Sequence, residues 1–230
     1  MKRQLAVLRP EPGWSATAAA ARARGLTVVG HPLFAAQPLE CAVPTGAYDA
    51  LLIGSRNAAV LGAPVLAAFA DLPVHAVGAA SAAAARRAGL TVAVSGTGGL
   101  QDLLDRVHDR ARDRPCRYLR LAGEAHVALL PRPGQTIETA IVYRMVPRPL
   151  AADFAAALTA RPPLVALHSA AAASHFAAEV DRLGIARGSL FLIALGPRIA
   201  KAAGTGWAAL HIADMPSDAA LLAKSEALCE

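Results

Sequence analysis

Short apolar runs recur along this chain, and alanine-rich stretches separate them. Apolar runs of this length that end at polar or turn residues indicate buried strands, and the alanine-rich stretches between them indicate helices. Strands that alternate with helices of about ten residues predict parallel sheets with crossover helices. We therefore expect strands at 4–9, 26–29, 50–53, 74–77, 91–94, 117–121 and 136–144.

Helices are expected in the intervals between these strands. Ser15 is a candidate N-cap for the first helix, which would end near Arg24 before Gly25. Prolines in the passage from 31 to 44 favour extended backbone there. From residue 151 the expected order is helix, strand, helix, strand, helix, strand, helix. The other helices are expected at 58–70, 81–88 and 99–112, with a helical turn near 127–130.

The second half of the chain repeats the plan of its middle. Residues 48–60 (YDALLIGSRNAAV) and 162–176 (PPLVALHSAAAASHF) each contain an apolar run, a serine and an alanine-rich stretch. Three matched units in one order indicate two similar α/β domains, with a ligand site between them as the default expectation. The two further matched pairs, in the same order, are 74–89 with 191–206 and 91–104 with 209–222.

The first strand–helix–strand segment is separated from its expected partners by the whole middle of the chain. The simplest organisation is a discontinuous first domain, 1–32 with 148–230, and an inserted second domain, 42–136. The segments 33–41 and 137–147 would then run side by side as a hinge that permits domain motion. The fold class expected is α/β: two similar parallel-sheet domains joined by a two-stranded connector.

Composition narrows the class of protein. Alanine dominates the 55% apolar content, so the core residues are the Leu, Val, Ile and Phe of the short runs. No apolar run approaches the roughly 18 residues that a membrane-spanning helix needs. The apolar stretch near the N-terminus is too short for the core of a signal peptide. We expect a cytoplasmic protein that makes no membrane contact.

Neither a disulfide framework nor a metal site is indicated. Cys41, Cys116 and Cys229 are odd in number and widely spaced, and the seven histidines include no HExxH motif. His168 and His175 could share a helix face only if both were helical, and His168 belongs to an expected strand. We expect no metal.

The net charge of +6 comes mostly from arginine. Arginine suits carboxylate and phosphate partners because its planar guanidinium binds bidentately. The densest basic stretch, 106–117, is interleaved with Asp109 and Asp113 and indicates a solvated helix face. An anionic small molecule therefore fits the charge as well as nucleic acid does. No helix-turn-helix with a clustered basic face is apparent, which makes a DNA-binding regulator the weaker alternative.

Candidate ligand-binding residues lie where expected strands pass into helices. Ser55 and Ser169 follow two apolar runs, and Gly78 and Gly196 mark two further junctions of the same kind. Helix N-termini at the carboxyl ends of parallel strands present unpaired N–H groups and bind anions. Ordinary helix capping by the serines is the alternative for each junction alone. The repetition in both domains favours an anion-binding cleft.

Tyr143 and Arg9 are two further candidates. Tyr143 lies near the end of the expected connector strand, where its phenol could donate a proton to a leaving hydroxyl, or could merely pack at the hinge. Arg9 ends the first strand and could pair with a carboxylate or be exposed. The glycine-rich segment GTGGLQ at 96–101 lacks the features of a phosphate loop or a dinucleotide-binding loop and indicates a turn before a helix. No GxSxG motif indicates a hydrolase.

Several of these segments, in this order, make the chain resemble the uroporphyrinogen-III synthase family over almost its whole length. The segments are LRPEPG, YDALLIGSRNAAV, VGAASAAAARRAG, YLRLAGE, IVYR, LVALHSAAAASHF and LGPRIAKAAG with a following Gly-Trp. The resemblance implies two α/β domains, no cofactor, and a linear hydroxymethyl tetrapyrrole with many carboxylates as substrate. It implies ring closure with inversion of the last ring and loss of water.

The resemblance also implies site residues. The tyrosine that assists departure of the hydroxyl falls on Tyr143. The chain departs from the family pattern at Gly54, Ala170 and Ile199, where the family usually has Thr, Pro and a hydroxyl residue. The expected substrate-binding residues are Arg9, Ser55, Arg56, Gly78, Ala79, Ser81, Ser169, Ala170, Gly196, Pro197 and Arg198.

Two functions are therefore expected from different classes. The first is an enzyme that cyclises hydroxymethylbilane by orienting it, as a monomer without nucleic-acid partners. The alternative is a binding protein for a tetrapyrrole or another anionic ligand, which has kept the fold and lost the chemistry. The missing side-chain donors at positions 54 and 199 favour this alternative slightly.

Overall fold

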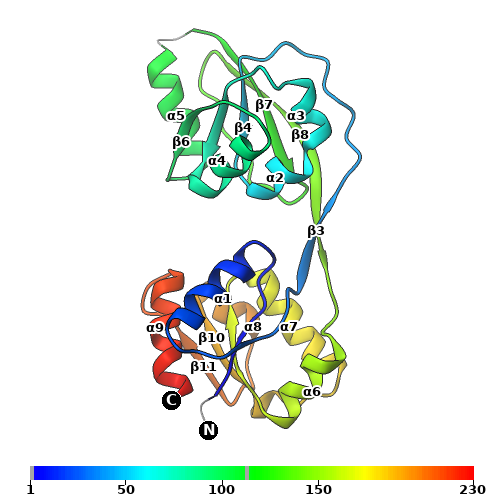
Figure 1. Ribbon diagram of the computed structural model, residues 1–230, viewed down its shortest axis with the longest axis vertical. Helices are drawn as coiled ribbons and strands as arrows, with labels where there is room; N and C mark the ends of the chain where they lie inside the picture. Colours follow the sequence, from blue (N-terminus) through cyan, green and yellow to red (C-terminus); the bar gives the residue numbers. More distant parts are fainter. Residues whose placement is uncertain (1–2, 112–113) are drawn as a thin grey trace. The chain divides into compact units, whose positions relative to one another are not determined.

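The chain forms two compact units in the computed structural model, which describes residues 3–111 and 114–230. Unit 1 comprises Met1–Ala35 and Val146–Glu230, and unit 2 comprises Ala36–Met145 (Figure 1). Each unit is a sheet covered by helices on both faces, as expected for the α/β class. In the described residues no helix is long and apolar enough to cross a membrane.

Unit 1 is built on a five-stranded parallel sheet in the order β11-β10-β9-β1-β2. Its strands are β1 (Leu5–Val7), β2 (Val28–Val29), β9 (Leu164–Leu167), β10 (Phe191–Ala194) and β11 (Ala209–Ile212). Its helices are α1 (Gly13–Ala23), α6 (Ala152–Ala160), α7 (Ala170–Arg182), α8 (Pro197–Ala203) and α9 (Asp218–Cys229), with a 3-10 turn at Arg187–Ser189. One face packs against α6, α7 and α8 around Phe176, and the other against α1 and α9 around Leu221.

Unit 2 is built on a six-stranded sheet in the order β3-β8-β7-β4-β5-β6. Its strands are β3 (Phe34–Pro38), β4 (Ala50–Ile53), β5 (Val74–Val77), β6 (Val92–Gly96), β7 (Cys116–Gly123) and β8 (Gln135–Pro147). The helices α2, α3 and α4 cover one face and α5 the other. These helices are α2 (Arg56–Leu61), α3 (Ala63–Ala68), α4 (Gly78–Arg87) and α5 (Leu100–Ala111).

The two sheets share one strand order, as the internal repeat predicts. β4, β5 and β6 correspond to β9, β10 and β11, and β7 lies beside β4 as β1 lies beside β9. The correspondence fails at one place. Helix α1 connects β1 to β2, but the loop 124–134 connects β7 to β8 and contains no helix. The strands β3 and β8 pair with each other and carry the chain between the two units.

Local sequence explains many of the element ends. β4 and β5 occupy the predicted residues. β4 is apolar and buried along its whole length, whereas β5 contains one polar residue, His75, which is also buried. Apart from the helix expected at 58–70 and the helical turn expected at 127–130, the other expected elements are present, with ends that differ by a few residues. Helix α4 begins at Gly78, three residues before the predicted start, because the positive φ of 75° at this glycine turns the chain directly into the helix. The predicted end of α5 at residue 112 lies outside the described residues.

Three local predictions are wrong. The predicted helix 58–70 is two helices, α2 and α3, that meet at Gly62. Ser15 does not cap α1, which starts at Gly13; the Glu11 carboxylate accepts hydrogen bonds from the backbone N–H and the hydroxyl of Ser15 instead. The predicted helical turn 127–130 is absent: these residues form an irregular part of the loop 124–134, where Pro131 disfavours helical backbone before it.

Candidate functional site

In unit 2 the candidate residues Ser55 and Tyr143 meet at the carboxyl end of the sheet. Ser55 has extended backbone and caps α2, because its Oγ accepts a hydrogen bond from the Asn57 N–H at 3.1 Å. The Tyr143 hydroxyl donates to the same Oγ, also at 3.1 Å. Ser55 Oγ thus accepts two hydrogen bonds, and its own hydroxyl hydrogen is left to donate to a ligand.

Gly123 explains how Tyr143 reaches Ser55. The pairing of β7 with β8 shifts register at Ala122 and Gly123, which sets Gly123 opposite Tyr143. A Cβ at Gly123 would stand 2.6 Å from Cζ of the Tyr143 ring. Only glycine therefore lets the ring lie across the end of β7.

A cavity of about 410 Å³ opens beside this pair, and Ser55 and Tyr143 both line it. Its volume lies in the range of small-molecule sites, roughly 300–1,000 Å³. The cavity lies between the start of α5 and the loop 124–134, over the ends of β4 and β7. The other lining residues are Gly54, Gly98, Gly99, Leu100, Gln101, Arg120, Leu121, Ala122, Gly123, Ala125, His126, Val127, Ala128 and Leu129.

The remaining candidates of unit 2 lie at the starts of α2 and α4. Arg56 is the first residue of α2 and is half-buried. Gly78 and Ala79 form the first turn of α4, where backbone N–H groups have no partner within the helix. Ser81 is only 5% exposed, because it faces the sheet from the second turn. Gly78 and Ala79 are thus better placed than Ser81 to meet a ligand.

In unit 1 the serine junction has the same extended, capping geometry as in unit 2, whereas the glycine junctions differ: Gly78 lies inside its helix with a positive φ, and Gly196 precedes its helix with extended backbone. Ser169 is extended and caps α7 through a hydrogen bond from Ala172 N–H to its Oγ, at 3.1 Å, and Ala170 is the first residue of that helix. Gly196 precedes α8, and Pro197 and Arg198 open it. Pro197 suits this place because a first-turn N–H would have no helical acceptor.

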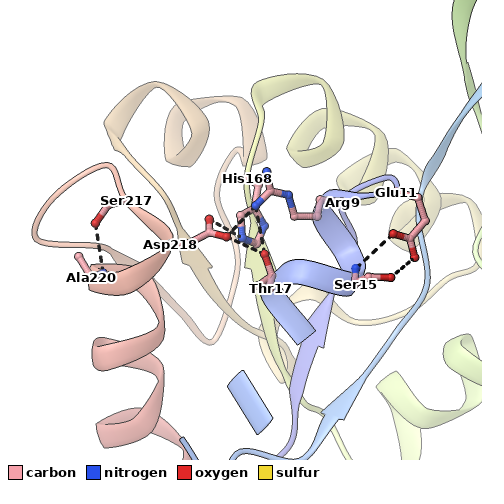
Figure 2. A network of polar contacts seen from close by, with 8 residues as sticks. All are labelled: Arg9, Glu11, Ser15, Thr17, His168, Ser217, Asp218 and Ala220. Carbon is pink, nitrogen blue, oxygen red and sulfur yellow. Dashed lines mark hydrogen bonds and ion pairs between the residues drawn. The ribbon is translucent and has the colours of Figure 1, made fainter. Parts of the chain in front are cut away.

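Arg9 belongs to a polar network inside unit 1 (Figure 2). Its Nη1 donates to Asp218 Oδ2 at 2.8 Å and to the Thr17 hydroxyl oxygen at 3.1 Å, and Thr17 also donates to Asp218 at 2.7 Å. His168 lies beside them, with Nε2 3.6 Å from Asp218 Oδ1. Arg9 was expected either to pair with a carboxylate or to be exposed. It pairs with a carboxylate of the protein itself, that of Asp218, and its side chain is 32% exposed.

Burial determines the charge state of His168. Its side chain is 4% exposed, and neither ring nitrogen has a hydrogen-bond partner. Burial and the positive charge of Arg9 lower the pKa of His168 to about 4, although Asp218 opposes the shift. The imidazole is therefore neutral near pH 7, and Arg9 is the positive charge of the network.

Sequence reasoning missed four residues of these two regions: Arg120 in unit 2, and Thr17, His168 and Asp218 in unit 1. Asp218 could have been found, because an acidic residue directly after Ser217 at a helix start is a common N-terminal pattern. Arg120 gave no signal, since a charged residue in a strand normally indicates an exposed position.

Comparison with known proteins places the chain in a family. The family described as uroporphyrinogen-III synthase HemD matches residues 15–223. A uroporphyrinogen-III synthetase from Helicobacter pylori has a similar fold, with a TM-score of 0.66 at 17% identity, over 98% of this chain and 99% of that one. No curated sequence matches this chain.

Structures of uroporphyrinogen III synthase from Thermus thermophilus are also similar. A mutant form gives a TM-score of 0.46 at 18% identity over 98% of both chains. A second structure gives 0.42 at 16% identity over 99% of this chain and 100% of that one. Because the family match spans most of its length and most of both units, this chain belongs to the uroporphyrinogen-III synthase family.

Proposed function

We propose that this uroporphyrinogen-III synthase closes the macrocycle by orienting its substrate, with Tyr143 assisting loss of the hydroxyl. The enzyme is a cyclising hydro-lyase: hydroxymethylbilane loses water, and the last ring is joined in the inverted sense. The bond to the hydroxymethyl oxygen breaks, and a bond forms to the substituted carbon of the last ring. The substituted carbon carries no hydrogen, so its bond to the neighbouring methylene bridge breaks, and the bridge bonds to the free α-carbon of the same ring. The proton lost from the free α-carbon and the departing hydroxyl together make the water.

This substrate ionises readily because its electron-rich pyrrole stabilises the carbon that loses hydroxyl. The main task of the protein is then to hold the chain in the conformation in which the last ring attacks through its substituted carbon. Orientation alone can supply effective molarities of about 10⁵ M or more. Such catalysis needs anion-binding groups in fixed positions and only one modest proton donor.

The observation that carries the proposal is the hydrogen bond between Tyr143 and Ser55 beside the cavity of unit 2. In our proposal the phenol hydrogen turns from Ser55 Oγ toward the leaving hydroxyl when substrate binds, and the Ser55 hydroxyl then donates its own hydrogen to the phenol oxygen, which keeps the ring in place. Backbone N–H groups at Gly78, Ala79 and the junctions of unit 1 bind carboxylates of the substrate. No cofactor takes part. The cytoplasmic location and the monomeric state stay predictions from the sequence.

The test is to incubate the purified protein with hydroxymethylbilane and to separate the isomers of the product. We expect the type III isomer from the wild type. Tyr143→Phe should lower kcat by about ten-fold or more, as for loss of a general acid, while the product stays type III. An unchanged rate would remove Tyr143 from the mechanism. Tight tetrapyrrole binding with only the type I isomer, at the spontaneous rate, would favour the binding-protein alternative.

A matched control is Tyr48→Phe. Tyr48 lies in the same unit, and its hydroxyl donates to Glu138 at 2.7 Å, but it does not line the cavity. Its loss removes a phenol hydroxyl of similar burial without touching the proposed site. The rate of this variant should stay within a factor of two or so of the wild type.

A further inference from the structure

Arg120 is a buried cation without a carboxylate partner. It lies in the middle of β7 and is 7% exposed. One nitrogen, Nη1, donates to the carbonyl oxygen of Val127 at 2.8 Å, whereas Nε has no hydrogen-bond partner. Within 3–111 and 114–230, no Asp or Glu forms an ion pair with it.

Such an arrangement costs free energy in the ligand-free protein. A buried charge is normally paired, because desolvation is expensive when no counter-charge offsets it. Burial lowers the pKa of the Arg120 guanidinium, but arginine stays protonated at neutral pH. The positive charge therefore remains, and no carboxylate among the side chains that the structure describes balances it.

The guanidinium lines the cavity of unit 2 together with the start of α5. Gly98, Gly99 and Leu100 bring this helix N-terminus to the cavity, so its unpaired N–H groups and positive dipole end act on the same space. Asp102 in the first turn is paired with Arg106 at 2.8 Å and does not line the cavity. Two independent features thus favour an anion here.

In unit 1, side chains of the protein fill the space that is equivalent to this cavity. The repeat matches Gly54 with His168 and Leu100 with Asp218, and strand register matches Ala122 with Arg9. In unit 2 these three positions line the cavity. Unit 1 fills them with its own arginine–aspartate pair, over which α1 packs (Figure 2). Unit 2 has neither the aspartate nor the helix. Its arginine, Arg120, lies in β7 two residues before Ala122, the position that matches Arg9.

We propose that this cavity is a binding site for an acid side chain of the substrate, with Arg120 and the N-terminus of α5 holding its carboxylate. The identity of the ligand rests on the proposed function. The cavity volume suits one pyrrole ring with its acetate and propionate side chains and not a whole tetrapyrrole. Nε is sealed from solvent, so the carboxylate would contact the guanidinium through its terminal nitrogens, which arginine can present to a carboxylate.

The first test compares Arg120→Gln with Arg117→Gln in steady-state kinetics. Arg117 is the matched control because it lies in the same strand but pairs with Glu138 at the surface, away from the cavity. Loss of a charged, buried hydrogen-bond donor should raise KM about ten-fold or more and change kcat little. Arg120→Lys, which keeps the charge without the planar fork, should be intermediate. An unchanged KM in Arg120→Gln would overturn the site.

The second test needs no turnover. A pyrrole that carries one acetate and one propionate should raise the Tm of the wild type and shift the Arg120 Nε–H resonance, and its diester should do neither. Without ligand, Arg120→Gln should keep or raise the Tm, because it removes an unbalanced buried charge. If Arg120→Gln has a lower Tm and the pyrrole leaves the Nε–H resonance of the wild type unmoved, Arg120 serves only the fold. That result would overturn the site.

These two tests separate the site from the proposed function. If the wild type yields only the type I isomer, the proposed reaction fails, but the titration with the diacid pyrrole still decides whether the cavity binds carboxylate. If the type III isomer forms with an unchanged KM in Arg120→Gln and the diacid does not bind, the proposed reaction stands and the site fails.

Discussion

At the scale of single residues, the two units treat the arginine near the carboxyl edge of the sheet in opposite ways. Unit 1 balances Arg9 with Asp218 and keeps His168 neutral beside them. Unit 2 leaves Arg120 unbalanced. A charge that is paired within the protein stabilises the fold, whereas an unpaired charge is available to a ligand. The same edge of the sheet therefore stabilises unit 1 and can bind an anion in unit 2.

The buried His168 predicts how stability depends on pH. Its pKa is about 4 in the folded chain and near 6.5 when unfolded. As pH falls from about 6.5 toward 4, the unfolded chain takes up a proton that the folded chain refuses, so the free energy of unfolding falls. His168→Asn should flatten this part of the curve, as measured by urea unfolding at pH 4.5 to 7.5.

The control for this series is His211→Asn, which shows how much any histidine substitution in unit 1 changes the slope. The groups that face His168 are Arg9 at the end of β1 and Asp218 at the start of α9. Curves for wild type and His168→Asn that run parallel over the whole range would contradict the assignment.

At the scale of elements, the loop 124–134 takes the place in unit 2 that helix α1 takes in unit 1, because each connects two neighbouring strands. Side-chain hydrogen bonds hold the loop, whereas backbone hydrogen bonds hold the helix. Gln101 of α5 accepts from the Leu130 N–H at 2.9 Å and donates to the Leu130 carbonyl at 3.0 Å. Arg120 binds the Val127 carbonyl of the same loop. Contacts from α5 and β7 therefore hold the loop over the cavity.

Gln101→Ala should loosen this loop without unfolding the unit. Two hydrogen bonds to the loop and one to Asp105 are lost, and each loss costs about 0.5–1.5 kcal/mol. Amide hydrogen exchange of the loop peptide should accelerate, while exchange in β7 stays slow. Gln37→Ala, at an exposed position of β3, is the control. Unchanged exchange at Leu130 would show that the loop does not depend on Gln101.

Elements that depend on local sequence were predictable, and those that depend on distant residues were not. The apolar runs of β4 and β5 and the serine caps at Ser55 and Ser169 are local signals. The break at Gly62 has a local cause, because Pro64 in the first turn of α3 cannot continue the hydrogen bonds of α2. Glycine at 62 depends on tertiary packing, since a Cβ there would stand 2.6 Å from a methyl carbon of Leu121. The hydrogen bond between Tyr143 and Ser55 joins residues 88 positions apart. The sequence therefore identified both residues as candidates, but it did not predict that they contact each other.

At the scale of the whole molecule, each unit has its own core. Two buried clusters lie wholly within unit 1, and two others lie wholly within unit 2. The strand order is shared, although unit 2 is continuous in sequence and unit 1 is interrupted. The domain limits expected from sequence, 1–32 with 148–230 and 42–136, remain a prediction about which pieces fold independently.

Fragments test that prediction. The piece 36–145 should fold alone and unfold cooperatively, because all of its core residues lie within it. The piece 146–230 should not fold, because it lacks β1, whose residues Leu5, Ala6 and Val7 are fully buried between β9 and β2. Circular dichroism during thermal unfolding distinguishes these outcomes.

A joined fragment is the decisive control for unit 1. Arg148 N–H donates to the Leu33 carbonyl at 2.8 Å, so the two segments of unit 1 run close together where unit 2 is inserted. A short glycine–serine linker from residue 35 to residue 146 should therefore restore folding at small entropic cost. If the joined fragment stays unfolded while 36–145 folds, unit 1 depends on unit 2, and the two units do not fold as independent domains.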